Sequence, residues 1–283
     1  MKVLVAGATG FTGSHLVPAL LAAGHEVHAL QRDGAAARSG WERVHVIAAD
    51  LAQILPKSLP AVDAVIHLAQ ANVPFPAQAE ELLSVNTSSA VALAAHAQRC
   101  GAVRMVYASS GTVYGFSSSK ITESHPLNGS GFYAQTKITA ERFLSEFRAQ
   151  LPVDLLRIFS PYGPGQQATR LIPDVIGRVR DGRAVSVREN GMPALTPIFI
   201  ADLVQVILAR LAATDSLTMN VAGAETVGIR DIAECAAGLV GREALFEINP
   251  APLDGGIAAD SALMTQATGV RPVSMQKGLA LCL

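Results

Sequence analysis

Residues 2–13 read K-V-L-V-A-G-A-T-G-F-T-G. The apolar run at 3–6 predicts a buried strand, and residues 13–23 predict the helix that follows it. Three glycines lie between the two, where glycine permits a tight turn and lets backbone N–H groups approach a pyrophosphate at the helix N-terminus. Their spacing differs from G-x-G-x-x-G, so an ordinary turn is the alternative. We predict cofactor contacts from five residues of this turn: Gly7, Gly10, Phe11, Thr12 and Gly13.

Strand-like and helix-like segments alternate through the first half of the chain. Further strands are expected at residues 27–30, 44–48, 64–68, 104–108 and 153–159, and further helices at 77–99 and 133–150. Continuous apolar runs that alternate with helices indicate a parallel sheet covered on both faces. The predicted fold class is therefore α/β, a Rossmann-like doubly wound sheet whose ligands bind at the carboxyl ends of the strands.

The second half has a different character. Residues 160–165 read S-P-Y-G-P-G, a turn-rich break, and an amphipathic segment at 171–180 and a strand-like segment at 184–187 follow it. We expect a dinucleotide-binding domain over residues 1–160 and a smaller substrate-binding lobe over 161–283. The boundary is soft, because the chain is expected to cross back between the two.

Composition excludes several classes of function. The chain has 283 residues with a net charge of −1, which gives no electrostatic reason to expect binding to nucleic acid or an anionic membrane. No apolar run approaches the roughly 20 residues of a membrane span, and the N-terminus lacks the pattern of a signal peptide. The three cysteines are far apart and no metal-ligand spacing exists, so neither a disulfide scaffold nor a metal site is expected. A cytoplasmic location is expected.

Tyr133 and Lys137 are four residues apart in a predicted helix. Residues i and i+4 share one helix face, so the ammonium is expected beside the phenol. A free phenol, with a pKa of about 10, is a poor acid–base catalyst at neutral pH. A neighbouring cation favours the phenolate, and together with the glycine turn the pair indicates hydride transfer on a nicotinamide cofactor.

The ends of the second and third strands bear on the choice of cofactor. Sites that prefer NAD usually place an acid at the end of the second strand, but here Gln31 stands there and Arg32 follows it. Arg32 suits a 2′-phosphate, so NADP(H) is favoured over NAD(H). Arg38 either assists or is a solvated loop residue. After the third strand, Asp50 and Leu51 are placed to contact adenine, although Asp50 equally suits a helix N-cap.

Taken together, these motifs resemble the extended short-chain dehydrogenase/reductases of the sugar-nucleotide epimerase/dehydratase branch. The similarity spans almost the whole chain. It rests on residues 7–13, 67–69, 86, 108–115, 133–137, 161–165 and 202, which include the Ser110-Gly111-Thr112-Val113-Tyr114-Gly115 stretch.

The resemblance implies a role for each matching residue. Ser110 would hydrogen-bond the reacting oxygen, Tyr133 would be the general acid or base, and Lys137 would lower the pKa of the tyrosine and hold the nicotinamide ribose. Asn86 would support the site. The cofactor contacts implied in addition are Leu68, Ala69, Asn86, Tyr133, Lys137, Ser160 and Pro161.

Departures from the family narrow the chemistry. The 4,6-dehydratases carry an Asp-Glu pair where this chain has Gly111-Thr112, so elimination of water is not expected. The fucose-synthase-like enzymes have a cysteine at the position of Thr112. Two arginines that usually grip the substrate diphosphate are replaced by Leu195 and Pro250. A buried diphosphate without such partners is costly, unless Arg170, Arg178, Arg180 or Arg183 replaces them.

These observations predict an NAD(P)-dependent enzyme that transfers hydride at one carbinol or ketone carbon of a sugar or nucleotide-linked sugar. Epimerisation and reduction both fit. The alternative is an NADPH-dependent reductase of a non-nucleotide ketone or aldehyde, which Arg32 and the missing arginines favour. The expected partners are a small-molecule substrate and a second copy of the chain, in a homodimer that packs residues 77–99 and 133–150 into a four-helix bundle.

Overall fold

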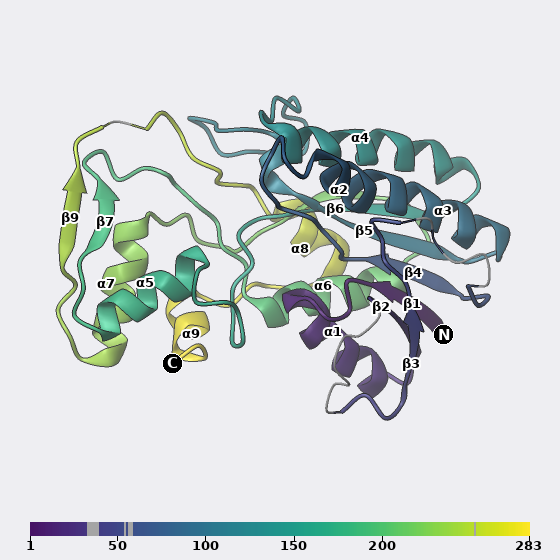
Figure 1. Cartoon of the computed structure of the whole chain (residues 1–283). Helices are drawn as coiled ribbons and strands as arrows, with labels where there is room; N and C mark the ends of the chain where they lie inside the picture. Colours follow the sequence, from purple (N-terminus) through teal and green to yellow (C-terminus); the bar gives the residue numbers. More distant parts are fainter. Residues whose placement is uncertain (33–39, 54, 56–58, 252) are drawn as a thin grey trace. The chain divides into compact units, whose positions relative to one another are not determined.

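The structure is a computed structural model that describes residues 1–32, 40–53, 55, 59–251 and 253–283. Its first half alternates strands and helices along the chain (Figure 1). The elements are β1 (Lys2–Ala6), α1 (Phe11–Ala22), β2 (Glu26–Gln31), β3 (Val44–Ala48), β4 (Ala64–His67), α2 (Ala79–Leu83), α3 (Ser89–Arg99), β5 (Arg104–Ser110), α4 (Phe132–Glu146) and β6 (Val153–Ile158). Each of the six predicted strands is present, with ends within two residues of the prediction.

Seven strands form one sheet in the order β3-β2-β1-β4-β5-β6-β8, in which β8 spans Thr218–Val221. The pairings from β3 through β5 are parallel; Val5, for example, lies between Ala29 of β2 and Ile66 of β4. The order of the first six strands is that of doubly wound dinucleotide-binding folds. The predicted fold class is confirmed, and the carboxyl ends of the parallel strands meet at one edge.

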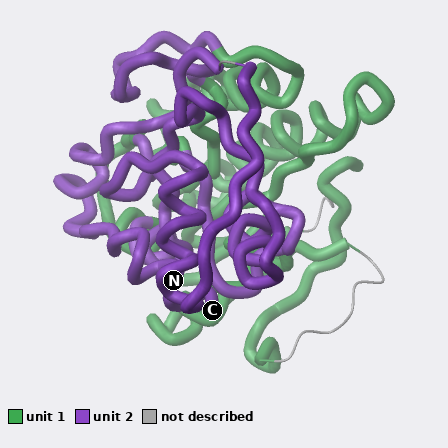
Figure 2. The backbone as a smooth tube through the Cα atoms, turned by 90° about the vertical axis from the view of Figure 1, so that its left-hand side faces the viewer, with its two compact units in different colours: residues 1–113, 129–157, 207–219 green, residues 114–128, 158–206, 220–283 purple. Residues whose placement is uncertain are grey.

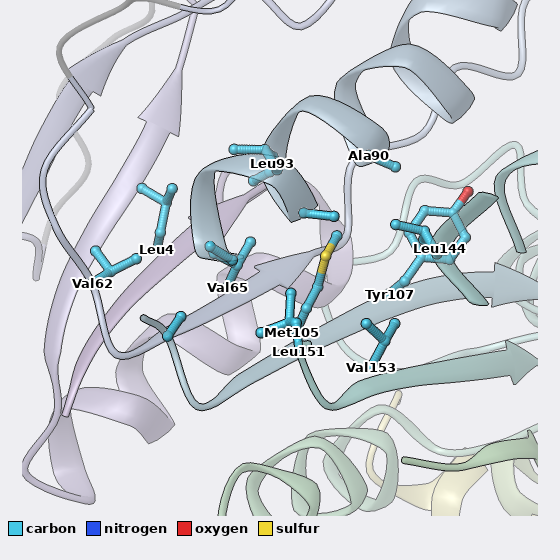
Figure 3. Close-up of a cluster of buried hydrophobic side chains, with 14 of the residues drawn as sticks. Leu4, Val62, Val65, Ala90, Leu93, Met105, Tyr107, Leu144, Leu151 and Val153 are labelled. Atoms are coloured by element: carbon cyan, nitrogen blue, oxygen red, sulfur yellow. The ribbon is translucent and has the colours of Figure 1, made fainter. Parts of the chain in front are cut away.

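Helices cover the sheet on both faces (Figure 1). Leu4, Val65 and Met105 point to one face and pack beneath α3, where Leu93 joins the same buried cluster (Figure 3). Successive residues of a strand point to opposite faces, so Val3 and Val5 of β1 face the side covered by α1. Burial on both faces explains why these strands are continuously apolar in sequence.

The predicted helix at 77–99 is interrupted. A π-helical segment, Ser84–Ser88, joins α2 to α3. Single π-helical turns within helices are rare and often lie at functional sites. The predicted helix at 133–150 is also shorter than expected, because its last part is a 3₁₀ turn, Phe147–Ala149, after α4.

The second half contains more secondary structure than the sequence predicted. The helix expected at 171–180 is present as α5 (Leu171–Arg180), and the expected strand is β7 (Val185–Arg188). The structure adds α6 (Ile200–Leu211), α7 (Ile229–Val240), β9 (Phe246–Asn249), α8 (Ala262–Thr268) and α9 (Met275–Ala280). Strands β7 and β9 form a separate parallel pair.

The chain divides into two compact units (Figure 2). Unit 1 comprises Met1–Val113, Gly129–Arg157 and Ile207–Met219, and unit 2 comprises Tyr114–Asn128, Ile158–Val206 and Asn220–Leu283. Among the residues described, no helix has the length and apolar character needed to span a membrane.

Candidate active site

The glycine turn between β1 and α1 is closely packed against the end of β4. Gly7 has a φ of 81°, and a Cβ added to it would lie 2.5 Å from the backbone nitrogen of Ala69. A Cβ on Gly13 would overlap the carbonyl oxygens of Gly7 and Ala8. Leu68 donates its N–H to the carbonyl of Ala6 (2.8 Å), which fixes the end of β4 beside the turn. The turn therefore tolerates only glycine at both positions.

This turn has the features that a dinucleotide pyrophosphate requires. Helix α1 begins at Phe11, its N-cap is Gly10, and no side chain caps it. Its first turn, which includes Phe11 and Thr12, carries no acidic residue. Uncapped N–H groups and the positive end of the helix dipole favour an anion at such an end. The residues present thus fit the predicted cofactor, whose contacts here stay a prediction.

The ends of β2 and β3 lie side by side, as expected. Ala49 donates its N–H to the carbonyl of Gln31 at 2.8 Å, and the Gln31 side chain is buried. Arg32 is exposed. The Asp50 carboxylate accepts the N–H of Ala52 at 3.0 Å, so it already has a structural role in its turn.

Two further residues complete this part of the predicted site. Leu51 packs against the buried cluster of Figure 3. Arg38 is outside the residues that the structure describes.

Asn86 is buried in the π-helical segment and ties two elements together. Its Oδ1 accepts the N–H of Ala71 at 2.8 Å, and its Nδ2 donates to the carbonyl of Ala71 and to Thr136 Oγ1 at 2.9 and 3.1 Å. Thr136 Oγ1 in turn donates to the carbonyl of Tyr133 at 2.7 Å. Asn86 therefore positions the loop after β4 and the first turn of α4. Its predicted contact with cofactor stays a prediction.

Ser110 is the last residue of β5. Its Oγ accepts hydrogen bonds from the N–H and the hydroxyl of Thr112, at 3.2 and 2.9 Å. The Ser110 hydroxyl proton has no acceptor among the described residues, and the side chain is partly exposed. The hydroxyl is therefore oriented by Thr112 and able to donate to an oxygen outside the protein.

Tyr133 and Lys137 lie one turn apart on α4, as the spacing predicts. The half-buried Tyr133 donates its hydroxyl to Gln70 Oε1 at 2.9 Å. Lys137 is fully buried, and its Nζ donates to the carbonyl of Ala108 at 2.8 Å, two residues before Ser110. The structure thus brings the lysine of α4 to the carboxyl end of β5, within the same unit as the glycine turn.

Burial controls the charge of two groups here. Desolvation lowers the pKa of Lys137 to about 7, and the nearby Glu141 carboxylate opposes that shift. Desolvation, together with the Lys137 charge, lowers the pKa of His67 to about 3. His67 Nε2 lies 2.7 Å from Ser89 Oγ, whose proton goes to the carbonyl of Val85, so Nε2 is the donor of a neutral ring. His67 is a packing residue at neutral pH, whereas Lys137 is close to its titration point.

Sequence reasoning missed the residues that support the site. Glu141, one turn after Lys137, accepts the Ser109 hydroxyl at 2.5 Å and pairs with Arg157 at 2.7 Å. All three are buried, and they join α4 to β5 and β6. The i+4 spacing of Lys137 and Glu141 was a usable signal, because both lie on one helix face. Gln70, the partner of Tyr133, carried only the weaker signal of a polar residue after a strand end.

Unit 2 contains the remaining predicted residues. Ser160, after β6, has a φ of 41°, a conformation that non-glycine residues rarely adopt and that often marks functional sites. Pro161 follows it. Leu195 is buried, and its backbone pairs with Val227 through two hydrogen bonds of 2.8 Å. Asp202, part of the resemblance, accepts the N–H of Val273 at 2.9 Å.

Of the four arginines named as replacements for the two absent diphosphate arginines, three form ion pairs with acidic side chains. Arg178 bonds Asp174 at 2.8 Å, and Arg180 and Arg183 both pair with Asp181, at 3.7 and 3.0 Å. Arg170, which precedes α5, is exposed and pairs with no acid among the described residues.

Comparison with known proteins agrees with this geometry. The family model of the NAD dependent epimerase/dehydratase family matches residues 3–222. A dTDP-4-dehydro-6-deoxy-D-allose reductase of Streptomyces sp is 27% identical, over 98% of this chain and 93% of its own. A UDP-glucose 4-epimerase of Mycolicibacterium smegmatis is 29% identical, over 99% and 96%.

Solved structures extend the likeness to the whole fold. MoeE5 in complex with UDP-glucuronic acid and NAD is 27% identical, with a TM-score of 0.85 over 100% of this chain and 97% of that one. A putative epimerase from Burkholderia cenocepacia has a TM-score of 0.87 at 19% identity, which shows the fold alone. The chain belongs to the NAD-dependent epimerase/dehydratase family, and it is an NAD(P)-dependent enzyme of the extended short-chain dehydrogenase type, as its motifs predicted.

Proposed function

We propose that the chain transfers hydride between a nicotinamide cofactor and one carbinol or ketone carbon of a nucleotide-linked sugar. The observation that carries this proposal is the geometry around Lys137. A buried ammonium bonds the end of β5, two residues from Ser110, while Tyr133 on the preceding turn reaches the surface. Relatives that cover nearly the whole chain include a reductase and an epimerase of nucleotide sugars.

Each residue of the chain has a separate task in this mechanism. A nicotinamide cofactor held at this site would supply or accept the hydride. Ser110 donates a hydrogen bond to the reacting oxygen, Tyr133 gives or takes its proton, and Lys137 lowers the pKa of that phenol and holds the ribose. The glycine turn and the α1 N-terminus hold the pyrophosphate. Exchange of Gln70 for substrate frees the Tyr133 hydroxyl for proton transfer.

Reduction and epimerisation differ in whether the cofactor is consumed. With a dTDP-linked 4-keto sugar we expect stoichiometric oxidation of NADPH to accompany formation of the alcohol. An epimerase would instead invert UDP-glucose at one carbon with no net change in cofactor. The assay is absorbance of the reduced nicotinamide together with chromatography of the sugar nucleotides. If the enzyme converts simple ketones but none of the sugar nucleotides, the proposed substrate class is refuted.

Those simple ketones and aldehydes are the second candidate substrates. The buried Leu195 and exposed Pro250 replace the usual diphosphate arginines, and Arg170 alone of the four alternatives lacks an acidic partner among the residues described. Inhibition by free UDP or dTDP, competitive with the carbonyl or sugar substrate, distinguishes the two candidates in the same assay, because only a nucleotide-sugar enzyme has a nucleotide site for its substrate.

We propose NADP(H) as the preferred cofactor. Gln31 provides no carboxylate to bind the ribose hydroxyls, and the exposed Arg32 is available to a 2′-phosphate. Substitution Arg32→Ser is expected to weaken NADPH binding by about tenfold, the effect of one charge-assisted contact, and to leave NADH binding unchanged. Isothermal titration of both proteins with each nucleotide measures this. Equal effects of the substitution on NADPH and NADH binding would contradict the proposal. The similar MoeE5 was solved with NAD, so both nucleotides are tested.

We also propose a cytoplasmic homodimer that packs α2, α3 and α4 of each copy together. Leu83 of α2 and Phe143 of α4 support it, because these large apolar side chains are 46% and 51% exposed in the single chain. Light scattering during size-exclusion chromatography gives the mass directly. A monomer at micromolar concentration would exclude this bundle.

A further inference from the structure

Two neighbouring strands of unit 1 bring two imidazoles and a carboxylate together. Glu26 and His28 are two residues apart on β2 and therefore share one face. His45 of β3 is the direct register partner of His28. The two imidazole rings stack with centroids 4.7 Å apart and an interplanar angle of 19°.

The Glu26 carboxylate lies close to both rings. Its Oε1 is 2.9 Å from His28 Nε2 and 3.7 Å from His45 Nε2. Ligand atoms of all three residues lie within 4.8 Å of one another. Two ligands of a tetrahedral zinc ion are about 3.3 Å apart, given metal–ligand bonds of about 2.0–2.1 Å. The two separations from Glu26 bracket that value. Because an ion lies near the plane of each imidazole ligand, the exposed His45 ring would turn out of the stack for its Nε2 to meet the ion beside His28.

We propose that Glu26, His28 and His45 bind a divalent transition-metal ion of the zinc class, with water at the fourth position. Two neutral imidazole nitrogens and one carboxylate are a ligand set that zinc uses in proteins, with an open site where only three protein ligands exist. The sequence spacing of these residues does not indicate a metal site, because His45 comes from a separate strand.

The surroundings leave the set open to an ion from solvent. His28 anchors the set, with a side chain 11% exposed, while His45 and Glu26 are 60% and 41% exposed and leave a path for entry. Lys2 pairs in register with Glu26, and its positive charge would repel the ion and lower the affinity of the site.

The ion would cross-link the edge strand β3 to β2. The predicted adenosine contacts are Gln31, the last residue of β2, and Asp50, two residues after β3. The cross-link would therefore stabilise that side of the cofactor site. Binding to the native state alone raises stability as the free ion concentration rises. We therefore expect zinc to raise the thermal midpoint of the whole chain.

The test is titration of chelator-treated full-length protein with Zn²⁺ by calorimetry, with thermal unfolding measured in parallel. We expect one ion per chain and a rise in the midpoint. His45→Gln and Glu26→Gln, each at an exposed side chain, should weaken binding by at least about tenfold and abolish the rise. Co²⁺ in the same site should show the visible bands of tetrahedral coordination.

Two controls make this proposal falsifiable. His125→Gln removes a histidine of unit 2 and should leave zinc binding unchanged. Cys100→Ser tests a different pair of adjacent ligand atoms, since Cys100 Sγ lies 3.5 Å from His96 Nε2. Loss of binding in Cys100→Ser with retention in His45→Gln would place the ion at that pair and overturn the proposal. Equal binding in every variant, or none in the wild type, would also overturn it.

Discussion

Tyr133→Phe is expected to reduce turnover by about 10²- to 10⁴-fold, the usual contribution of a positioned general acid or base. The substitution keeps the ring on α4 and removes only the hydroxyl. The hydrogen bond from this hydroxyl to Gln70 is at the surface, so the free energy of unfolding should change by less than about 1 kcal/mol through its loss. Steady-state kinetics and thermal unfolding of the same preparation measure both effects.

Gln70→Ala is the matched control for this substitution. It removes the same hydrogen bond and retains the phenol, so turnover should change only by about the few-fold effect of one exposed hydrogen bond. Binding of the cofactor to Tyr133→Phe should remain measurable, because the glycine turn is untouched. Unchanged turnover in Tyr133→Phe would refute the proposed mechanism, and equal losses in both variants would assign the effect to the hydrogen bond.

The sheet and the main motifs were predictable because their signals are local. Continuous apolar runs identified six strands, and the glycine turn needs only its neighbours in sequence to be recognised. The spacing of Tyr133 and Lys137 likewise follows from one helix. These features depend on periodicity and short-range sterics, which a single sequence contains.

Features that depend on contacts between distant residues were not predictable. The π-helical segment that holds Asn86 interrupts a helix whose sequence is regular, and Gln70 meets Tyr133 from 63 positions away. The partnership of Glu141 with Arg157 requires β6 to lie beside β5. The same reason applies to His28 and His45, which only the pairing of β2 with β3 brings together.

Lys137→Met is expected to reduce turnover strongly and yet to stabilise the protein near neutral pH. Loss of the ammonium leaves Tyr133 without a cation to favour its phenolate, so turnover should fall by about 10²-fold or more. The wild-type lysine is costly, because burial lowers its pKa to about 7 from 10.5. Below pH 7 the native state carries a buried charge that the methionine variant lacks.

The sign of the pH dependence follows from this shift. Between pH 7 and 10.5 the unfolded chain binds a proton at Lys137 that the native state does not, so wild-type stability rises with pH in that window. Near pH 7 the variant should therefore be more stable by about 1–3 kcal/mol, after allowance for the lost hydrogen bond to Ala108. The advantage should shrink as the pH approaches 10.

Denaturant unfolding of both proteins at several pH values, without cofactor, isolates Lys137 and the groups coupled to it, because titrations that do not depend on Lys137 cancel in the difference. Lys120→Met, at an exposed lysine, is the control and should show no such trend. A constant difference across the pH range would mean that Lys137 titrates normally. Lys137 would then remain charged across this pH range, and its burial would not destabilise the protein.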